Sequence, residues 1–438
     1  MNFDESGFIL SHDQLMRNKV VDIDRNNIEH LITNFVSEEQ RWSQSVREKV
    51  KYKDMNPGSG RDYILDEFRI KNTAGTVVTM PYGDMITFNS SRHFFRGENR
   101  IYPSSIPSLN RKLMHITSKE DKELYRSVSN LRMYQFFKLI WNIHIVPYWE
   151  AKLCEVNYKA LAQHYGFETS LLDLTNDFTT ALFFATCYYD NTDNKFYPLT
   201  KDMIKRSEET RYGMLFHSPN WRLDWFSGAG YINAMVNNTM KELKEPCTID
   251  SGKLDGCALQ IGYQPLMRCH SQNAYVFPMR ESEPLQMNNK FEKWRFEQTE
   301  ELSNYVYEMM DCGRKVYPEE GITSISDIIK KIQESNIFSE DDIQYVYEMD
   351  IDKAIFPTID KFKNALRETE VLFDGTKRKI ELVSYDIIYL TDMSIFDSIN
   401  ALYDNINIWT QIGGMIHQKG PQKRWREERC KQIFGKLI

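Results

Sequence analysis

The chain has 438 residues, of which 41% are hydrophobic and 27% are charged, and its formal net charge is −7. This composition excludes collagen-like, fibrous and fully disordered chains, and the length suits two or three domains. A mildly acidic chain is not a general nucleic-acid coat, although a local basic patch can still contact phosphates.

The seven cysteines include no CxxC pair. They predict free thiols in a reducing compartment, and neither a disulfide framework nor a zinc site. The first residues lack the basic and apolar regions of a signal peptide, and the apolar stretch at residues 181–189 is too short to cross a bilayer. We therefore expect a soluble, cytoplasmic protein that does not bind membranes.

Hydrophobic periodicity and the positions of Gly, Pro and Asn predict the elements in chain order. The first half is expected to form a helix at 24–54, strands at 76–80 and 93–96, and helices at 119–145, 151–166 and 177–189. The second half is expected to form strands at 213–216, 257–261 and 274–277, helices at 291–311 and 324–335, one or two strands at 378–390, and a helix at 393–417.

Helices and strands intermix without a regular βαβ rhythm. This favours an α+β fold with a mixed or antiparallel central sheet over a doubly wound one. The breakers at residues 56–60 predict a separate helical N-terminal element over residues 1–57. The tail from residue 419 has an excess of basic residues, which indicates either a solvated helix end or a patch that contacts phosphates.

The common nucleotide and hydrolase fingerprints are missing. The sequence has no P-loop, no GxGxxG after a strand, and no HExxH or GxSxG motif. No cluster of His and Cys predicts a metal site. The chemistry must therefore come from less common patterns, of which three stand out.

The first pattern is Phe95-Arg96-Gly97-Glu98, followed by residues 107–111 (PSLNR). An Arg that leaves a strand beside a Gly can reach a ligand phosphate while the backbone approaches closely. The competing interpretation is a structural Arg96 paired with Glu98 or Asp173.

The second pattern, residues 162–175, places His164, Thr169, Asp173 and Thr175 among apolar residues. Buried polar groups are costly unless they are paired, so this segment predicts a polar network or a ligand site. The third pattern is residues 268–272, where Arg268 and Gln272 can donate to an anion and a sugar hydroxyl, or simply form a polar pair at the sheet edge.

The motifs follow one another in the order FRG, PSLxR, AxQHYGxxTxLLDxT and RxxxQ. With these motifs in this order, the chain resembles the FRG domain family over about residues 85–280. The resemblance implies an FRG domain at residues 58–335, flanked by the N-terminal element and by a mostly helical region with a basic tail at residues 336–438. Proteins of this family include candidate toxins and defence effectors of prokaryotic and phage conflict systems. The motif order is similar to that of ADP-ribosyltransferases, which implies a sheet of that type.

The resemblance implies an enzyme that uses NAD as its substrate, without a metal, to modify a protein or nucleic-acid target. Arg96 would hold ribose or phosphate, Tyr165 would stack on nicotinamide, and Gln272 would bind a ribose hydroxyl. The expected catalytic residues are Arg96, Glu98, His164, Asp173 and Gln272. The expected binding residues are Arg96, Tyr165, Thr169, Thr175, Arg268 and Gln272.

Two other functions are compatible with the same residues. One is a non-catalytic module that binds or senses a nucleotide or nucleic acid, with the terminal helices docking a regulatory partner. The other is a hydrolase or nuclease in which His164 acts as general base and Asp173 orients it. Because Gln272 carries no charge, a transferase would need Glu98 or Asp173 as its carboxylate.

Overall fold

The computed structural model describes residues 19–53, 77–80, 83–86, 92–143, 146, 158–219, 258–261, 266–279, 284–373, 376–387, 389 and 394–399. The expected linker at residues 56–60, the basic tail and most of the expected helix 393–417 lie outside these residues. Within that helix, residues 394–399 are described and are helical.

The centre of the fold is a seven-stranded sheet with the order β1-β11-β8-β4-β5-β10-β9. Its strands are β1 (Lys19–Val20), β4 (His93–Glu98), β5 (Leu171–Thr175), β8 (Tyr212–Pro219), β9 (Leu259–Gln260), β10 (Ala274–Pro278) and β11 (Glu292–Glu297). All neighbouring strands are antiparallel except β1 and β11. The α+β class and the mixed, mainly antiparallel sheet are thus confirmed.

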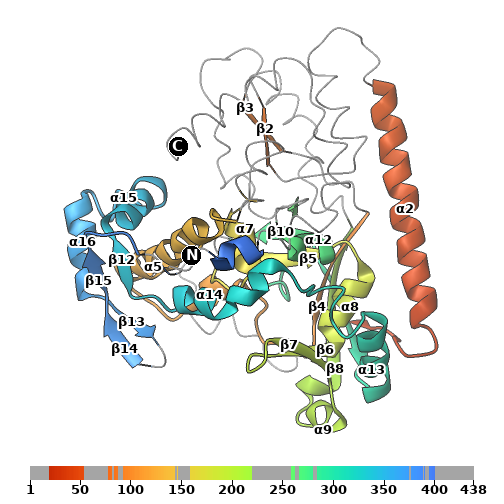
Figure 1. Ribbon diagram of the computed structural model, residues 1–438. Coiled ribbons are helices and arrows are strands. Elements are labelled where there is room, and N and C mark those ends of the chain that lie inside the picture. Colours follow the sequence, from red (N-terminus) through yellow and green to blue (C-terminus); the bar gives the residue numbers. More distant parts are fainter. Residues whose placement is uncertain are drawn as a thin grey trace.

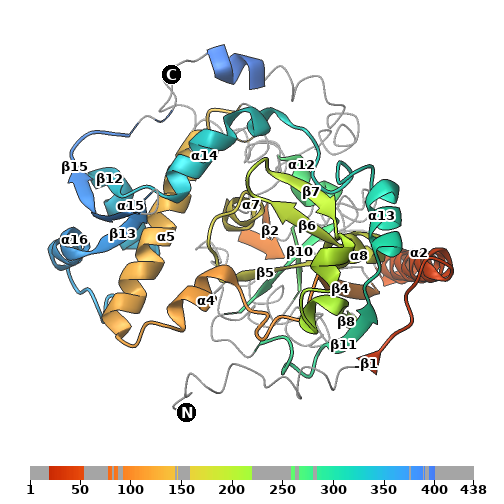
Figure 2. The same cartoon turned by 90° about the horizontal axis from the view of Figure 1, so that it is seen from below.

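Helices surround the sheet (Figures 1 and 2). In chain order they are α2 (Ile28–Lys53), α4 (Ser108–Leu113), α5 (Lys119–Ile140), α7 (Tyr158–His164), α8 (Phe178–Thr186), α9 (Lys201–Ile204), α12 (Met267–Ser271), α13 (Glu300–Met309), α14 (Ser326–Gln333), α15 (Glu340–Met349) and α16 (Ile359–Glu368). Two short 3-10 turns are η2 (Glu209–Arg211) and η5 (Gly321–Ile325).

Helices α2, α8 and α13 share one apolar cluster with β4, β8 and β11, which includes the fully buried Phe95, Phe183 and Phe296. A second cluster joins α5, α7 and α14 to β10, and a third fills the other side of β4, β5, β8 and β10. Buried apolar area of this kind is the main term that stabilises a fold. Apolar clusters therefore pack against both faces of the sheet.

Two predicted helices are wrong in part. The helix expected at 177–189 begins as predicted, capped by the Asp177 side chain, but ends at Thr186. Cys187–Asp190 form β6, which pairs with β7 (Lys195–Pro198), because the paired tyrosines and the turn-forming residues 191–194 favour a hairpin. The helix expected at 291–311 begins only at Glu300, since the residues before it pair with β8 as β11.

Short strand pairs complete the fold. They are β2 (Val77–Met80) with β3 (Gly83–Ile86), β12 (Ile337–Ser339) with β15 (Glu381–Val383), and β13 (Glu370–Phe373) with β14 (Thr376–Lys379). In both ribbon views, α15, α16 and β12–β15 lie beyond α5, at the end of the molecule opposite α2 (Figures 1 and 2).

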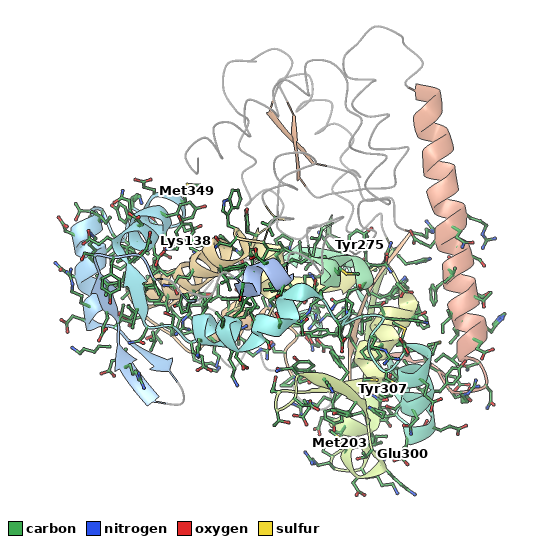
Figure 3. All side chains as sticks on the ribbon, viewed as in Figure 1. Lys138, Met203, Tyr275, Glu300, Tyr307 and Met349 are labelled. Carbon is green, nitrogen blue, oxygen red and sulfur yellow. The ribbon has the colours of Figure 1, made fainter. Side chains whose placement is uncertain are left out.

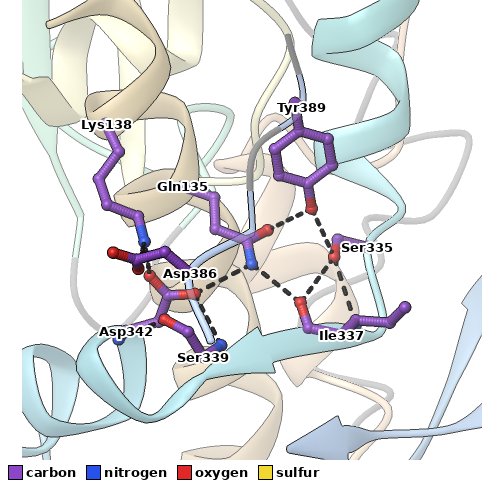
Figure 4. A network of polar contacts seen from close by, with 8 residues as sticks. All are labelled: Gln135, Lys138, Ser335, Ile337, Ser339, Asp342, Asp386 and Tyr389. Atoms are coloured by element: carbon purple, nitrogen blue, oxygen red, sulfur yellow. Dashed lines mark hydrogen bonds and ion pairs between the residues drawn. The ribbon is translucent and has the colours of Figure 1, made fainter. Parts of the chain in front are cut away.

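The C-terminal elements are not an independent unit, since they share an apolar cluster with Leu124, Val128 and Leu131 of α5. A polar network reinforces this contact (Figure 4). The Gln135 amide donates to Ile337 O at 2.8 Å and to Asp342 Oδ2 at 3.1 Å, while Lys138 Nζ lies 2.6 Å from Asp342 Oδ1. Helix α5 therefore belongs equally to the sheet domain and to the C-terminal elements.

Strands β4 and β5 part immediately after they meet. Their single registered pair is Phe95 with Thr175, and beyond it the Arg96 side chain reaches across to the Asp173 carbonyl. The ladder between β4 and β5 stops after this pair, so backbone groups and side chains beyond it face a gap between the strands. Polar residues are concentrated at this point of the sheet.

Among the described helices, none combines the length and the apolar character that a membrane span needs.

Candidate functional site

A cavity of about 600 Å³ opens where β4 and β5 part, a volume within the usual range for small-molecule sites. Its walls come from the end of β4, from β5, from the β6–β7 hairpin and from the segment around α9. Figure 3 shows one of its residues, Met203 of α9, near the end of the molecule where Glu300 and Tyr307 lie. Five of the residues expected from sequence line it: Arg96, Glu98, Asp173, Thr175 and Gln272.

Arg96 and Glu98 are neighbours on one face of β4, because side chains two apart on a strand point the same way. Arg96 Nε donates to Glu98 Oε1 at 2.9 Å, and Arg96 Nη1 donates to Asp173 O at 3.0 Å. The second oxygen of Glu98 accepts from the Ser105 hydroxyl at 2.7 Å. Both oxygens of this buried carboxylate are thus occupied, which favours a supporting role for Glu98.

Asp173 is the second carboxylate of the cavity, and 42% of its side chain is exposed. Its Oδ1 accepts a hydrogen bond from the Gln163 amide. Thr169 does not line the cavity and instead donates to the other end of the Gln163 amide. Of the two carboxylates, Asp173 is therefore the one a ligand can reach.

Thr175 and Gln272 contribute mainly to the wall. The Thr175 hydroxyl donates to Gln272 O at 2.7 Å and accepts from Asp177 N at 3.0 Å. Gln272 Nε2 donates to Val316 O at 3.0 Å. These contacts join β5 to the start of β10 and fix the cap of α8.

His164 does not reach the cavity. Its side chain is 2% exposed, and Nε2 lies 3.8 Å from Asp173 Oδ1, too far for a hydrogen bond. Burial lowers the pKa of His164, and Arg268 lowers it further, while Asp173 acts in the opposite direction. The imidazole is neutral at pH 7 and sits behind the carboxylate, which does not suit a general base for a ligand in this cavity.

Tyr165 and Arg268 belong to a buried cluster behind the site. The Arg268 guanidinium lies over the rings of Tyr165 and Tyr317, at 4.4 and 3.7 Å from their centroids, and Nη1 donates to His164 O at 2.9 Å. The Tyr165 hydroxyl donates to Glu320. Neither residue lines the cavity, so the expected contacts of Tyr165 with nicotinamide and of Arg268 with an anion have no geometric support.

Sequence reasoning missed much of the cavity wall. Besides Arg96, three further arginines line it, Arg100, Arg111 and Arg206, and none of these three forms an ion pair with another described residue. The aromatic part of the wall is formed by Tyr102, Phe184, Tyr188, Tyr189 and Phe196. The helix predicted through residue 189 assigned Tyr188 and Tyr189 to a core helix, so only the hairpin turn at residues 191–194 could have signalled their position.

Cys187 also lines the cavity, but burial raises the pKa of its thiol to about 12. A thiol of that pKa is a poor nucleophile near neutral pH.

In the described part of the chain, no three His, Cys, Asp or Glu side chains are grouped as metal ligands.

Comparison with protein families gives a match for residues 91–194, to the model of the FRG domain. The chain carries an FRG domain. The match is narrower than the range expected from sequence, and it runs from just before β4 through the β6–β7 turn. Neither the search of curated proteins nor that of solved structures finds a match.

The FRG segment supplies most of the cavity but not all of it. Arg96, Glu98, Asp173 and Tyr188 lie inside residues 91–194, whereas Arg206 and Gln272 lie outside them. Strands β8, β10 and β11, which complete the sheet, also follow the matched segment. The FRG domain of this chain therefore needs later parts of the sequence to close its site.

Proposed function

We propose that the cavity binds NAD as a substrate and that the protein is an ADP-ribosyltransferase-like enzyme. The observation that carries this proposal is the combination, in one cavity, of three arginines that pair with no described carboxylate, an aromatic wall and one exposed carboxylate, Asp173. A dinucleotide with a positively charged leaving group needs each of these: cations for its pyrophosphate, rings for its bases and a negative charge near the anomeric carbon.

The pyrophosphate is assigned to Arg100, Arg111 and Arg206. Guanidinium groups bind phosphate oxygens with two parallel hydrogen bonds, and Arg100 lies over the Tyr102 ring, 4.5 Å from its centroid, which holds it at the wall. Tyr188 and Tyr189 are assigned to the bases. Arg96 is held on two sides, by Glu98 and by Asp173 O, and its remaining nitrogen is assigned to a ribose hydroxyl.

The reaction we infer breaks the bond between nicotinamide and ribose. The electron pair of that bond moves to the nicotinamide nitrogen and neutralises its charge, and the ribose becomes oxocarbenium-like. The Asp173 carboxylate stabilises this positive charge. It then takes the proton of the attacking group, which is a side chain, a nucleic-acid atom or water, as the new bond to ribose forms.

Two further features support this function. The mainly antiparallel sheet, with Arg96 at the point where β4 and β5 part, is compatible with an ADP-ribosyltransferase-like sheet. The FRG resemblance, with its candidate toxins and defence effectors, supports an effector role in a conflict system, in which the target is a protein or nucleic acid.

A second function is favoured by the state of Glu98 and Gln272. Both are held by other groups of the protein, Glu98 through Arg96 and Ser105 and Gln272 through Val316. If Asp173 only balances the charge of the arginines, the cavity is a non-catalytic site that binds or senses a nucleotide. The two functions differ in nicotinamide release and not in affinity.

The deciding experiment measures nicotinamide release from NAD by mass spectrometry, with cell extract as a source of acceptors, and NAD binding by calorimetry. We expect release by the wild-type protein, and a loss of about 100-fold or more in Asp173→Asn, as for removal of an acid–base group. Asp202→Asn, on the exposed surface of α9, is the control. Binding without release would establish the binding module, and absence of both would refute both functions.

A further inference from the structure

Gln163, at the end of α7, is the residue in contact with the exposed carboxylate of the cavity. Its Nε2 donates to Asp173 Oδ1, and its Oε1 accepts from the Thr169 hydroxyl. The three side chains form a chain of hydrogen bonds from the turn after α7 to the cavity. Gln163 and Thr169 do not line the cavity themselves.

Thr169 determines which end of the Gln163 amide faces Asp173. The Thr169 hydroxyl accepts a hydrogen bond from Leu171 N at 3.1 Å, and its own proton is directed to Gln163 Oε1. The Thr169 hydroxyl has a single proton, and Gln163 Oε1 accepts it, so the amide oxygen points to Thr169. The amide N–H group is thereby directed at Asp173 Oδ1, which accepts its hydrogen bond.

The rest of the surroundings leaves Asp173 with one oxygen for a ligand. His164 is neutral and its Nε2 is too far from Oδ1 to compete with Gln163. Among the described residues no hydrogen bond involves the second oxygen, Oδ2, and the Asp173 carbonyl is held separately by Arg96. One oxygen of the carboxylate is thus held by Gln163, and the other has no hydrogen bond to a described residue.

We propose that Gln163, oriented by Thr169, is a positioning residue that holds the Asp173 carboxylate aimed at the ribose of the substrate. This proposal rests on the proposed function for its catalytic consequence, but the contact itself can be tested without activity. A precisely oriented carboxylate matters because stabilisation of developing charge depends on preorganised groups.

The contact is tested by a double-mutant cycle on the full chain, read as thermal unfolding at pH 7. Gln163→Glu sets two carboxylates against each other, and Asp173→Asn leaves two amides. Each single change should lower Tm, whereas the swap Gln163→Glu with Asp173→Asn restores one donor against one carboxylate and should recover most of the loss. Additive effects in the double variant would overturn the proposal.

The positioning role is tested by the kinetics of nicotinamide release. In Gln163→Glu, repulsion between the two carboxylates turns Asp173 away from its orientation, so kcat should fall about tenfold or more while KM changes little. Thr169→Val should reduce kcat as well, and Thr169→Ser, which keeps the hydroxyl, should rescue it. An unchanged kcat in Gln163→Glu would refute the positioning role.

Gln135→Glu is the matched control, because Gln135 makes the same amide-to-carboxylate contact with Asp342, at 3.1 Å, in the C-terminal network (Figure 4). It should lower Tm without changing kcat. If the wild-type protein releases no nicotinamide, the proposed function fails, while the double-mutant cycle still decides whether Gln163 holds Asp173. If the protein releases nicotinamide and the double-mutant cycle is additive, the proposed function stands and only the positioning role of Gln163 fails.

Discussion

Gly97 of β4 lies directly against the backbone of Ala181 in α8. A Cβ atom at Gly97 would stand 1.7 Å from the Ala181 carbonyl oxygen and 2.8 Å from Ala185 N. Both neighbours are backbone atoms of a helix, which cannot turn aside as a side chain can. The glycine of the FRG motif is therefore required for helix–strand packing, and it brings the end of α8 close to the cavity wall.

Gly97→Ala should lower the free energy of unfolding by about 3 kcal/mol or more, since an added methyl group in a packed interior forces the backbone to shift. Urea denaturation followed by circular dichroism measures this change. If Gly97→Ala unfolds at the same urea concentration as the wild-type protein, this result would contradict the close contact with α8.

The stability of the protein should fall as the pH falls below about 6.5, because burial lowers the pKa of His164 below its ordinary value. Below this pH the unfolded chain binds a proton at His164 that the folded chain does not bind. The contribution of His164 to the free energy of unfolding is therefore fully present above about pH 6.5, and it is lost as the pH falls from there to the pKa of the folded state. His164→Gln removes this group and should flatten the slope of Tm against pH. An unchanged slope would show that His164 is protonated equally in both states. Some slope should remain, since burial also lowers the pKa of His93.

Replacing Arg100, Arg111 or Arg206 by Ala should raise the Kd for ADP-ribose about tenfold each, because each loses a charge-assisted hydrogen bond to phosphate. Calorimetry at low and high salt measures this, and the loss should shrink at high salt. Arg314→Ala is the control, since Arg314 is exposed and paired with Asp311. Equal effects of all four variants would contradict a phosphate site in the cavity.

Lys138 contacts two carboxylates that should differ in importance. Asp342 is fully buried and Asp386 is 61% exposed, and Lys138 lies 2.6 and 3.1 Å from them (Figure 4). Asp342→Asn should lower the free energy of unfolding by about 2 kcal/mol, as when a buried partner is lost, whereas Asp386→Asn should change it by less than about 1 kcal/mol. Chemical denaturation compares the two, and equal effects would argue against the network joining α5 to the C-terminal elements.

The candidate site was only partly predictable. Arg96, Glu98 and Asp173 stand in local motifs, and the contact of Arg96 with Glu98 follows from their spacing on one strand. Arg206 comes from a different part of the chain, and no local pattern assigns it to the same cavity. Periodicity places Tyr188 and Tyr189 in a helix, because it cannot distinguish an apolar run at the end of α8 from a short strand.

The α+β class, the FRG motifs and most element positions follow from local patterns in the sequence, because hydrophobic periodicity acts over a few residues. That residues 292–297 form a strand depends on their pairing with β8 in the folded protein. The fold also places Tyr165 and Arg268 behind the site and packs the C-terminal elements against α5. These features depend on contacts between segments that are far apart in the sequence. No local sequence pattern contains the energies of such contacts.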